Sequence, residues 1–246
     1  AIEVRKPAKA VEHIAVLHFL RTRGVLDAYI DTIDRFDLES NLGLARLFWY
    51  GVRLQANLEG RVQYQGRVLE VESGSGFFGV LLAAGGLARH YVMVDLPEML
   101  LNALLHVRML LPDTVIRVGQ APDFACEVRT FWLLETSEIQ KVPDDSIDVA
   151  LNFNSFMEMD EEVRDFYIDE IYRTGTSGAL FYNVNRRQKS MTRKDGGTFD
   201  NNPLLYPYRS TDRVIEWETD ECQENCRSAL FRSPHPSFCI SRMANI

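Results

Sequence analysis

The first sixty residues space their apolar side chains at intervals of three and four, as one face of an α-helix requires. Residues 7–36 follow this pattern, and so does the later run "NLGLARLFWYGVRLQANL". Each of these apolar faces needs a partner to pack against. We therefore expect residues 1–60 to form a helical cap or extension on a main domain of residues 61–246.

From residue 67 onward, short apolar runs alternate with helical patterns. Strands are predicted at residues 67–72, 90–95, 130–135, 146–154 and 178–185. Helices are predicted at residues 79–86, 97–110 and 160–175, and a short one near residues 211–217. A Gly/Asn/Pro-rich loop is predicted at residues 196–207, and two late strands at residues 228–233 and 237–243. Alternating strands and helices indicate an α/β fold. The prediction is a Rossmann-like, doubly wound and mostly parallel sheet with a C-terminal antiparallel hairpin.

Composition narrows the partners of the chain. The formal net charge is −8, which argues against nucleic acid as the main partner. The basic stretch at residues 184–194 is interpreted as a solvated loop. No apolar run is long enough to span a membrane, no secretory signal pattern is present, and a cytoplasmic location is expected. The four cysteines do not form a disulfide framework, and Cys222 and Cys226 lack the further ligands of a metal site, so no metal is expected.

The stretch "VLEVESGSGFFGVLLA", residues 68–83, predicts a strand, a glycine turn and a helix. Ligands of parallel sheets bind at the carboxyl ends of strands, and glycines such as Gly74 and Gly76 let the backbone approach them closely. The stretch also satisfies G-x-G-x-x-G, and Asp95 follows Gly76 by 19 residues, as a dinucleotide-binding fold requires. Two acids, Glu70 and Glu72, precede the glycines. Negative charge there repels a pyrophosphate and attracts the sulfonium or ammonium group of S-adenosylmethionine (SAM).

Several further stretches resemble known methyltransferases. "ETSEIQKVPDDSIDVALN" is similar to the segment of SAM-dependent methyltransferases that contacts adenine and leads into the fourth strand. "YVMVDLPEML", "NFNSFMEMD" and "LFYNVNRR" together resemble the sugar O-methyltransferase family, and the likeness covers residues 67–187. The resemblance implies SAM as cofactor and a hydroxyl of a sugar or glycan precursor as acceptor.

The resemblance also implies roles for individual residues. Glu70 corresponds to the acid at the methionine end of SAM, and Glu72 stands where the family has the first loop glycine. The other cofactor contacts come from four places: the glycine turn, the ribose-binding acid and its neighbour, the adenine edge, and the end of the fourth strand. These residues are, in order, Gly74 and Gly76, Asp95 and Leu96, Ser137 and Glu138, and Asn152. Glu72 either pairs with the ammonium group of the cofactor or crowds its pocket.

Polar residues that follow the fourth and fifth strands are candidates for the acceptor side. Asn154 and Ser155 follow the fourth strand, and Asn185 and Arg186 follow the fifth. The alternative for Asn154 and Ser155 is a helix cap. A base that removes the hydroxyl proton accelerates methyl transfer, and the candidates are Glu158 first and His106 second.

Two other functions stay open. An NAD-dependent oxidoreductase would need an acid/base group, yet the sequence contains no Tyr-x-x-x-Lys. A catalytically inactive methyltransferase-fold binding protein is also consistent with Glu72 at a glycine position. The sequence does not indicate an oligomeric state.

Overall fold

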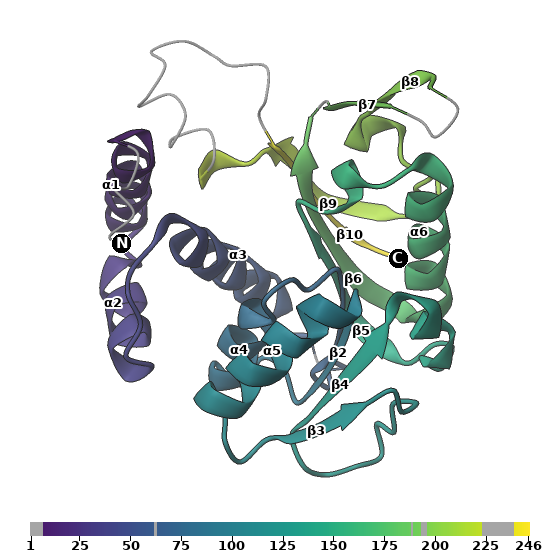
Figure 1. The fold of residues 1–246 in the computed structure, drawn as a ribbon, viewed down its shortest axis with the longest axis horizontal. Coiled ribbons are helices and arrows are strands. Elements are labelled where there is room, and N and C mark those ends of the chain that lie inside the picture. Colours follow the sequence, from purple (N-terminus) through teal and green to yellow (C-terminus); the bar gives the residue numbers. More distant parts are fainter. Residues whose placement is uncertain (1–6, 62, 188, 193–195, 223–238) are drawn as a thin grey trace.

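The computed structural model describes residues 7–61, 63–187, 189–192, 196–222 and 239–246 (Figure 1). Three helices form the N-terminal region: α1 (Pro7–Thr22), α2 (Leu26–Arg35) and α3 (Leu42–Leu58). Helix α3 begins at Asn41, whose side chain accepts a hydrogen bond from the Leu44 N–H at 3.0 Å. The helices predicted there are confirmed.

The main sheet has eight strands in the order β3-β4-β2-β1-β5-β6-β10-β9. The strands are β1 (Arg67–Val71), β2 (His90–Asp95), β3 (Val115–Val118), β4 (Thr130–Glu135), β5 (Ile147–Phe153), β6 (Gly175–Arg186), β9 (Arg213–Thr219) and β10 (Cys239–Asn245). The six strands β3, β4, β2, β1, β5 and β6 run parallel, and β10 pairs antiparallel with β6 and β9. The predicted doubly wound, mostly parallel sheet is confirmed.

Helices cover both faces of this sheet (Figure 1). One face is covered by α3, α4 (Phe77–Ala84) and α5 (Pro97–Leu110), and the other by α6 (Glu161–Thr174). Three short 3-10 turns follow strands or loops: η1 (Thr136–Lys141), η2 (Phe156–Glu158) and η3 (Pro203–Leu205). The first core contains Trp49 of α3, Phe78 of α4 and Val68 of β1, so the N-terminal helices share a core with the sheet. The second core packs α6 against the opposite face.

The C-terminal third corrects several predictions. Residues 211–217 were expected to be helical, but β9 lies there because its extended backbone pairs with β10. The strand pair β7 (Lys189–Thr192) and β8 (Thr198–Asn201) occupies stretches expected to be loop. Strand β3 was not predicted. An antiparallel pair does form the edge, with β9 and β10 as its strands, and the predicted strand at residues 228–233 lies outside the described residues.

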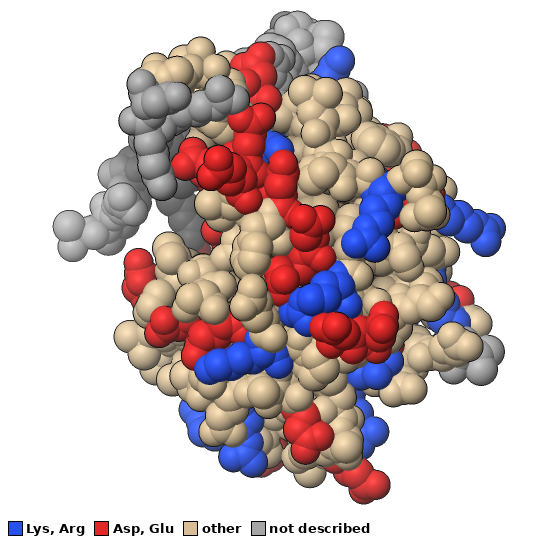
Figure 2. Space-filling view, turned by 90° about the vertical axis from the view of Figure 1, so that its right-hand side faces the viewer, with Lys and Arg blue, Asp and Glu red and all other residues tan. Residues whose placement is uncertain are grey.

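The surface over α6 gathers acidic side chains (Figure 2), among them the exposed Glu162 and Asp169. Arg173 lies among them and pairs with Glu170 at 2.6 Å and with Asp144. In the part of the chain that the structure describes, no helix combines the length and apolar character needed to cross a membrane.

Candidate cofactor site at the glycine turn

The turn between β1 and α4 holds three residues in the left-handed backbone region. Glu72, Gly74 and Gly76 have φ angles of 54°, 57° and 68°. A Cβ on Gly76 would lie 2.7 Å from the Cβ of Ala103 in α5. A Cβ on Gly74 would meet none of the described atoms within 4 Å. The turn therefore packs tightly on α5 at Gly76 and faces open space at Gly74, where a ligand can approach the backbone.

Glu70 is a buried acid below this turn. Its carboxylate accepts a hydrogen bond from the Tyr91 hydroxyl at 2.8 Å. Burial raises the pKa of Glu70 to about 8, although the Tyr91 hydrogen bond opposes that rise. Glu70 is therefore mostly protonated at neutral pH unless a cation lies beside it.

Asp95, the last residue of β2, is only 3% exposed, and its carboxylate faces the turn. Its two oxygens accept hydrogen bonds from the backbone N–H groups of Gly74 at 2.6 Å and Leu96 at 2.7 Å. Burial raises the pKa of Asp95 against these two hydrogen bonds, which lower it. The predicted ribose-binding acid thus contacts the residue that borders the open space, and the Leu96 side chain next to it is exposed.

Glu72 occupies the position at which the resemblance expects a glycine, and its backbone has the left-handed form that glycine favours. Its N–H donates to the Val94 carbonyl at 2.7 Å. Burial, and then the charge of Asp95, raise the pKa of Glu72 to about 7. Burial and the charges of Glu72 and Asp95 also raise the pKa of Tyr167 in α6 to about 12.

The three acids around the glycine turn share one electrostatic feature. In the described part of the chain, none of Glu70, Glu72 and Asp95 forms an ion pair. The buried Ser73 hydroxyl in the same turn also has no hydrogen-bond partner among these residues. Three acids without an ion-pair partner, grouped around a turn that is open at Gly74, fit a cationic group better than a diphosphate.

A cavity of about 260 Å³ lies between α5 and β4, next to the end of β2. Pro97, Leu100 and Leu133 contribute apolar walls, and Glu138 of η1 lies at its polar edge. The Glu138 carboxylate accepts the Glu135 N–H at 3.1 Å and contacts the Lys141 ammonium at 2.5 Å. Glu138 therefore caps η1 as well as lining the cavity, whereas Ser137 is exposed.

The ends of β5 and β6 form a different kind of region, an amide network of Asn152, Ser155, Asn183 and Asn185, all buried. The Asn152 amide nitrogen donates to the Val71 carbonyl at 3.1 Å and to the Ser155 hydroxyl. Its carbonyl oxygen accepts from the Asn185 amide at 2.8 Å. The network thus joins β5 and β6 to the last residue of β1.

Asn185 also forms its hydrogen bonds within the chain. Its carbonyl oxygen accepts the Met157 N–H at 3.1 Å, and its amide also donates to Asn183. Asn183 in turn donates to the Tyr208 hydroxyl at 2.7 Å. The structure therefore gives Asn152, Ser155 and Asn185 internal partners.

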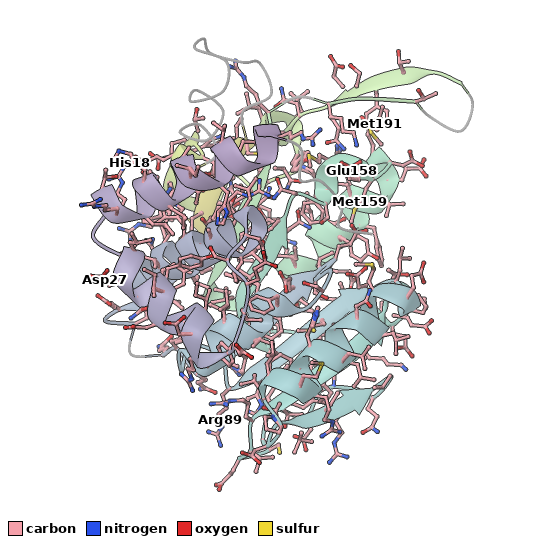
Figure 3. All side chains as sticks on the ribbon, turned by 60° about the vertical axis from the view of Figure 1, so that its left-hand side comes forward. His18, Asp27, Arg89, Glu158, Met159 and Met191 are labelled. Carbon is pink, nitrogen blue, oxygen red and sulfur yellow. The ribbon has the colours of Figure 1, made fainter. Side chains whose placement is uncertain are left out.

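Three of the residues predicted on the acceptor side, Asn154, Glu158 and Arg186, are partly or fully exposed near the ends of β5 and β6. Asn154 follows β5 with a φ of 62° and accepts from the Cys239 thiol at 3.4 Å, and Arg186 is partly exposed at the end of β6. Glu158 is exposed on η2, lies at the end of the molecule that carries β7 (Figure 3), and pairs with Lys189.

His106, on α5, contacts the glycine turn directly. Its Nδ1 is 2.8 Å from the Ser75 carbonyl, and its ring packs edge-on against Phe77 with centroids 6.4 Å apart. The structure thus places His106 against Ser75 and Phe77 of the turn, whereas Glu158 lies on η2 after β5.

Sequence reasoning did not single out Tyr91, Tyr167 or Asn183. Tyr91 and Tyr167 belong to apolar strand and helix patterns, and only the structure brings them near Glu70 and Glu72. Asn183 had a usable signal, because it alternates with Asn185 and so points to the same face of β6.

No family model matches the sequence, and no curated protein matches it. Among solved structures, a candidate sarcosine dimethylglycine methyltransferase from Galdieria sulphuraria has a TM-score of 0.55 at 12% identity, over 82% of this chain and 85% of that chain. The chain has a methyltransferase fold. A chain from the complex of the Haloferax volcanii Trm112 methyltransferase activator with a candidate methyltransferase has a TM-score of 0.50 at 14% identity, over 80% of this chain and 88% of that chain.

The methyltransferase fold agrees with the sheet order and with the antiparallel placement of β10 beside β6. The resemblance to sugar O-methyltransferases is finer than a likeness of fold and stays a prediction.

Proposed function

We propose that the protein is a SAM-dependent methyltransferase whose acceptor is a hydroxyl of a sugar or glycan precursor. The observation that carries the cofactor assignment is the set of three acids at the glycine turn, Glu70, Glu72 and Asp95, without an ion pair among the described residues. SAM supplies a methyl group activated by positive sulfur, and it also carries an ammonium group.

The methyltransferase fold and the open space at Gly74 support a cofactor that lies across the carboxyl ends of β1 and β2. Asp95 is the proposed acceptor for the ribose hydroxyls, with the cavity lined by Pro97 and Glu138 beside it for adenine. Glu70 and Glu72 are proposed to face the methionine end, where a positive charge would favour their ionised forms.

On the acceptor side, Glu158 is the proposed general base, because it follows β5 and is accessible at the rim. Asn154 and Arg186 are proposed to contact the acceptor. His106 is proposed to hold the glycine turn through the Ser75 carbonyl rather than to accept the hydroxyl proton. The sugar as acceptor class rests on the sequence resemblance alone.

Calorimetric titration with SAM, its demethylated product and NAD tests the cofactor. We expect SAM and the product to bind and NAD to bind at least tenfold more weakly, because its diphosphate meets the acids. Glu72→Gln should weaken SAM binding about tenfold at pH 8, since one opposite charge near 4 Å is worth a few kcal/mol at most in a half-buried site. Glu161→Gln removes an acid in the first turn of α6 and is the control. Tighter SAM binding in Glu72→Gly would instead mean that Glu72 crowds the pocket.

Methyl transfer to a panel of sugars and sugar phosphates, followed by mass spectrometry, tests the acceptor. Glu158→Gln should lower kcat by a factor of about 100 or more without changing SAM affinity. Glu162→Gln, an exposed acid in the first turn of α6, is the control. Transfer to amines but to no hydroxyl would overturn the sugar assignment and leave the cofactor assignment intact.

A further inference from the structure

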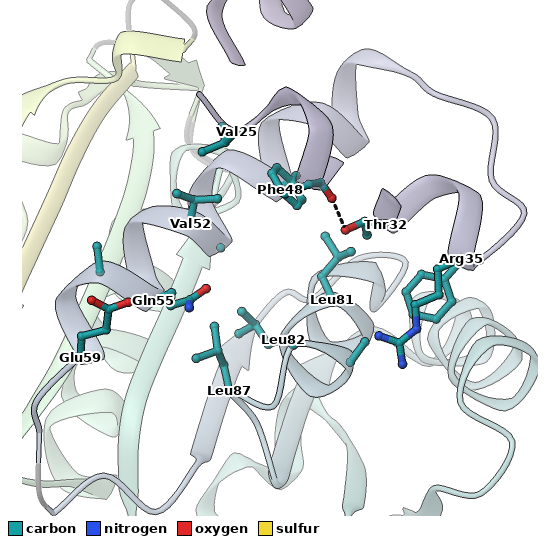
Figure 4. Close-up of a pocket in the computed structure, with 16 residues that line it drawn as sticks. Val25, Thr32, Arg35, Phe48, Val52, Gln55, Glu59, Leu81, Leu82 and Leu87 are labelled. Atoms are coloured by element: carbon teal, nitrogen blue, oxygen red, sulfur yellow. Dashed lines mark hydrogen bonds between the residues drawn. The ribbon is translucent and has the colours of Figure 1, made fainter. Parts of the chain in front are cut away.

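A second cavity, of about 460 Å³, lies between the N-terminal helices and the last turn of α4 (Figure 4). Val25, Phe48 and Val52 line it from the N-terminal region, and Leu81 and Leu82 line it from α4. Its volume is in the range of about 300–1,000 Å³ typical of small-molecule sites. It lies at the end of α4 away from the glycine turn, so it is separate from the proposed cofactor site.

Small residues maintain this space. Helices α3 and α4 come together at Gly51, where an added Cβ would lie 3.7 Å from Phe78 and 3.9 Å from Leu82. Beyond that contact, Ala28, Ala56 and Ala84 line the cavity. The space is open to solvent, because Ala28 and Ala56 are exposed, and its apolar walls lack the dispersion contacts that a bound apolar group would supply. The cavity is therefore shaped to hold an apolar body.

The polar groups at the cavity indicate the charge of that body. Arg35, the last residue of α2, lies at one end of the view in Figure 4, and Glu59, just after α3, lies at the other. The Arg35 guanidinium lies 5.4 Å from the Phe36 ring centre and has no ion pair or hydrogen bond among the described residues. The Thr32 hydroxyl, by contrast, already donates to the Ala28 carbonyl at 2.7 Å.

Arg35 offers a fork of donors that matches a carboxylate. The Glu59 carboxylate at the far end opposes a second negative charge. We propose that this cavity is a binding site for a monocarboxylate with an apolar chain or ring, whose carboxylate pairs with Arg35 and whose body lies between Phe48, Val52 and Leu81. This inference does not depend on the methyltransferase assignment.

Titration of the 246-residue chain with hexanoate, octanoate and decanoate, below their micellar concentrations and without SAM, tests the site. Affinity should rise about fourfold per methylene, in line with the free energy of burying one methylene. Octan-1-ol, which has the same chain without the charge, should bind at least tenfold more weakly than octanoate. Equal binding of octanol and octanoate, or no binding of any acid, would overturn the proposal.

Two variants locate the binding. Arg35→Gln should lower octanoate affinity to the level of octanol, while Arg21→Gln, an exposed arginine in the last turn of α1, should leave it unchanged. Ala28→Leu fills part of the cavity from the exposed side of α2 and should weaken decanoate more than hexanoate. Unchanged binding in both Arg35→Gln and Ala28→Leu, with melting temperatures at the wild-type value, would place the ligand elsewhere and reject the site.

Discussion

The two neighbouring strands β1 and β5 end in the same backbone geometry but in different chemistry. Glu72 follows β1 with a φ of 54°, and Asn154 follows β5 with a φ of 62°. Each donates its N–H to the carbonyl of an adjacent strand at 2.7 Å, Glu72 to Val94 and Asn154 to Val184. The acid has no ion pair among the described residues, whereas the amide accepts from the Cys239 thiol. The difference therefore lies in the side chains and not in the backbone.

The surroundings of the two turns extend this contrast. Glu70 and Asp95 add two more acids at the end of β1 and β2, and the pKa of each is raised by burial. At the ends of β5 and β6, Asn152 and Asn185 satisfy each other and nearby backbone groups. Ionising a buried acid without a cation is costly, whereas amides that hydrogen-bond to each other carry no such cost. We infer that a ligand supplies the missing partners at the ends of β1 and β2, while the amides at the ends of β5 and β6 find their partners within the chain.

The largest effect is expected from Asn152→Ala. This change removes the partners of the Val71 carbonyl, the Phe156 N–H and the Asn185 amide, and each unsatisfied buried group costs about 1–3 kcal/mol. The free energy of unfolding in urea should fall by about 3 kcal/mol or more. Asn102→Ala, an exposed asparagine on α5, should change it by less than about 0.5 kcal/mol. Unchanged stability with lost SAM affinity would make Asn152 a ligand contact and remove the contrast between the ends of β1 and β5.

Asp95→Asn should have the next largest effect, on binding. Hydrogen bonds to a charged group are worth about 1.5–3 kcal/mol each, so SAM affinity by calorimetry should fall about a hundredfold. Unfolding free energy should change much less, because Asn still accepts one of the two backbone N–H groups. Asp113→Asn, at an exposed site, is the control. A loss of stability as large as that of Asn152→Ala would show that Asp95 is structural.

The sequence predicted the parallel core of the fold because its strands are apolar and lie between helices with clear periodicity. Residues 130–135 and 97–110 match β4 and α5. It failed at residues 211–217, where β9 is largely exposed at the sheet edge, so its pattern reflects backbone pairing with β10 rather than burial. In the site, the glycine turn and Asp95 follow from spacing. Internal pairing of Asn152 with Asn185 does not, because it depends on register between strands.

Measuring stability and SAM affinity across a pH series tests the role of Glu72 at the end of β1. Its folded pKa of about 7 exceeds its ordinary value of 4.5, so the folded state holds the extra proton and stability should fall as pH rises from about 4.5 to about 7. A cationic cofactor prefers the ionised carboxylate. Ionisation of Glu72 should therefore raise SAM affinity by up to tenfold per pH unit below about 7, and Glu70, with a pKa of about 8, should extend the rise to about pH 8. Glu72→Gln should flatten this profile in calorimetric titrations, and a profile with the same slope in that variant would assign the titration to another group.

The smallest effects are expected when each of the two left-handed turn residues becomes glycine. Glu72→Gly relieves a strained backbone and removes a half-buried acid, so unfolding free energy without ligand should rise by about 1 kcal/mol. Asn154→Gly should change it by less than about 0.5 kcal/mol, because asparagine adopts left-handed backbone readily. Thermal unfolding at pH 8, where Glu72 is mostly ionised, gives the widest difference. Equal stabilisation by the two changes would mean that backbone strain alone accounts for both effects. The Glu72 carboxylate would then carry no energetic cost that a bound cation could relieve.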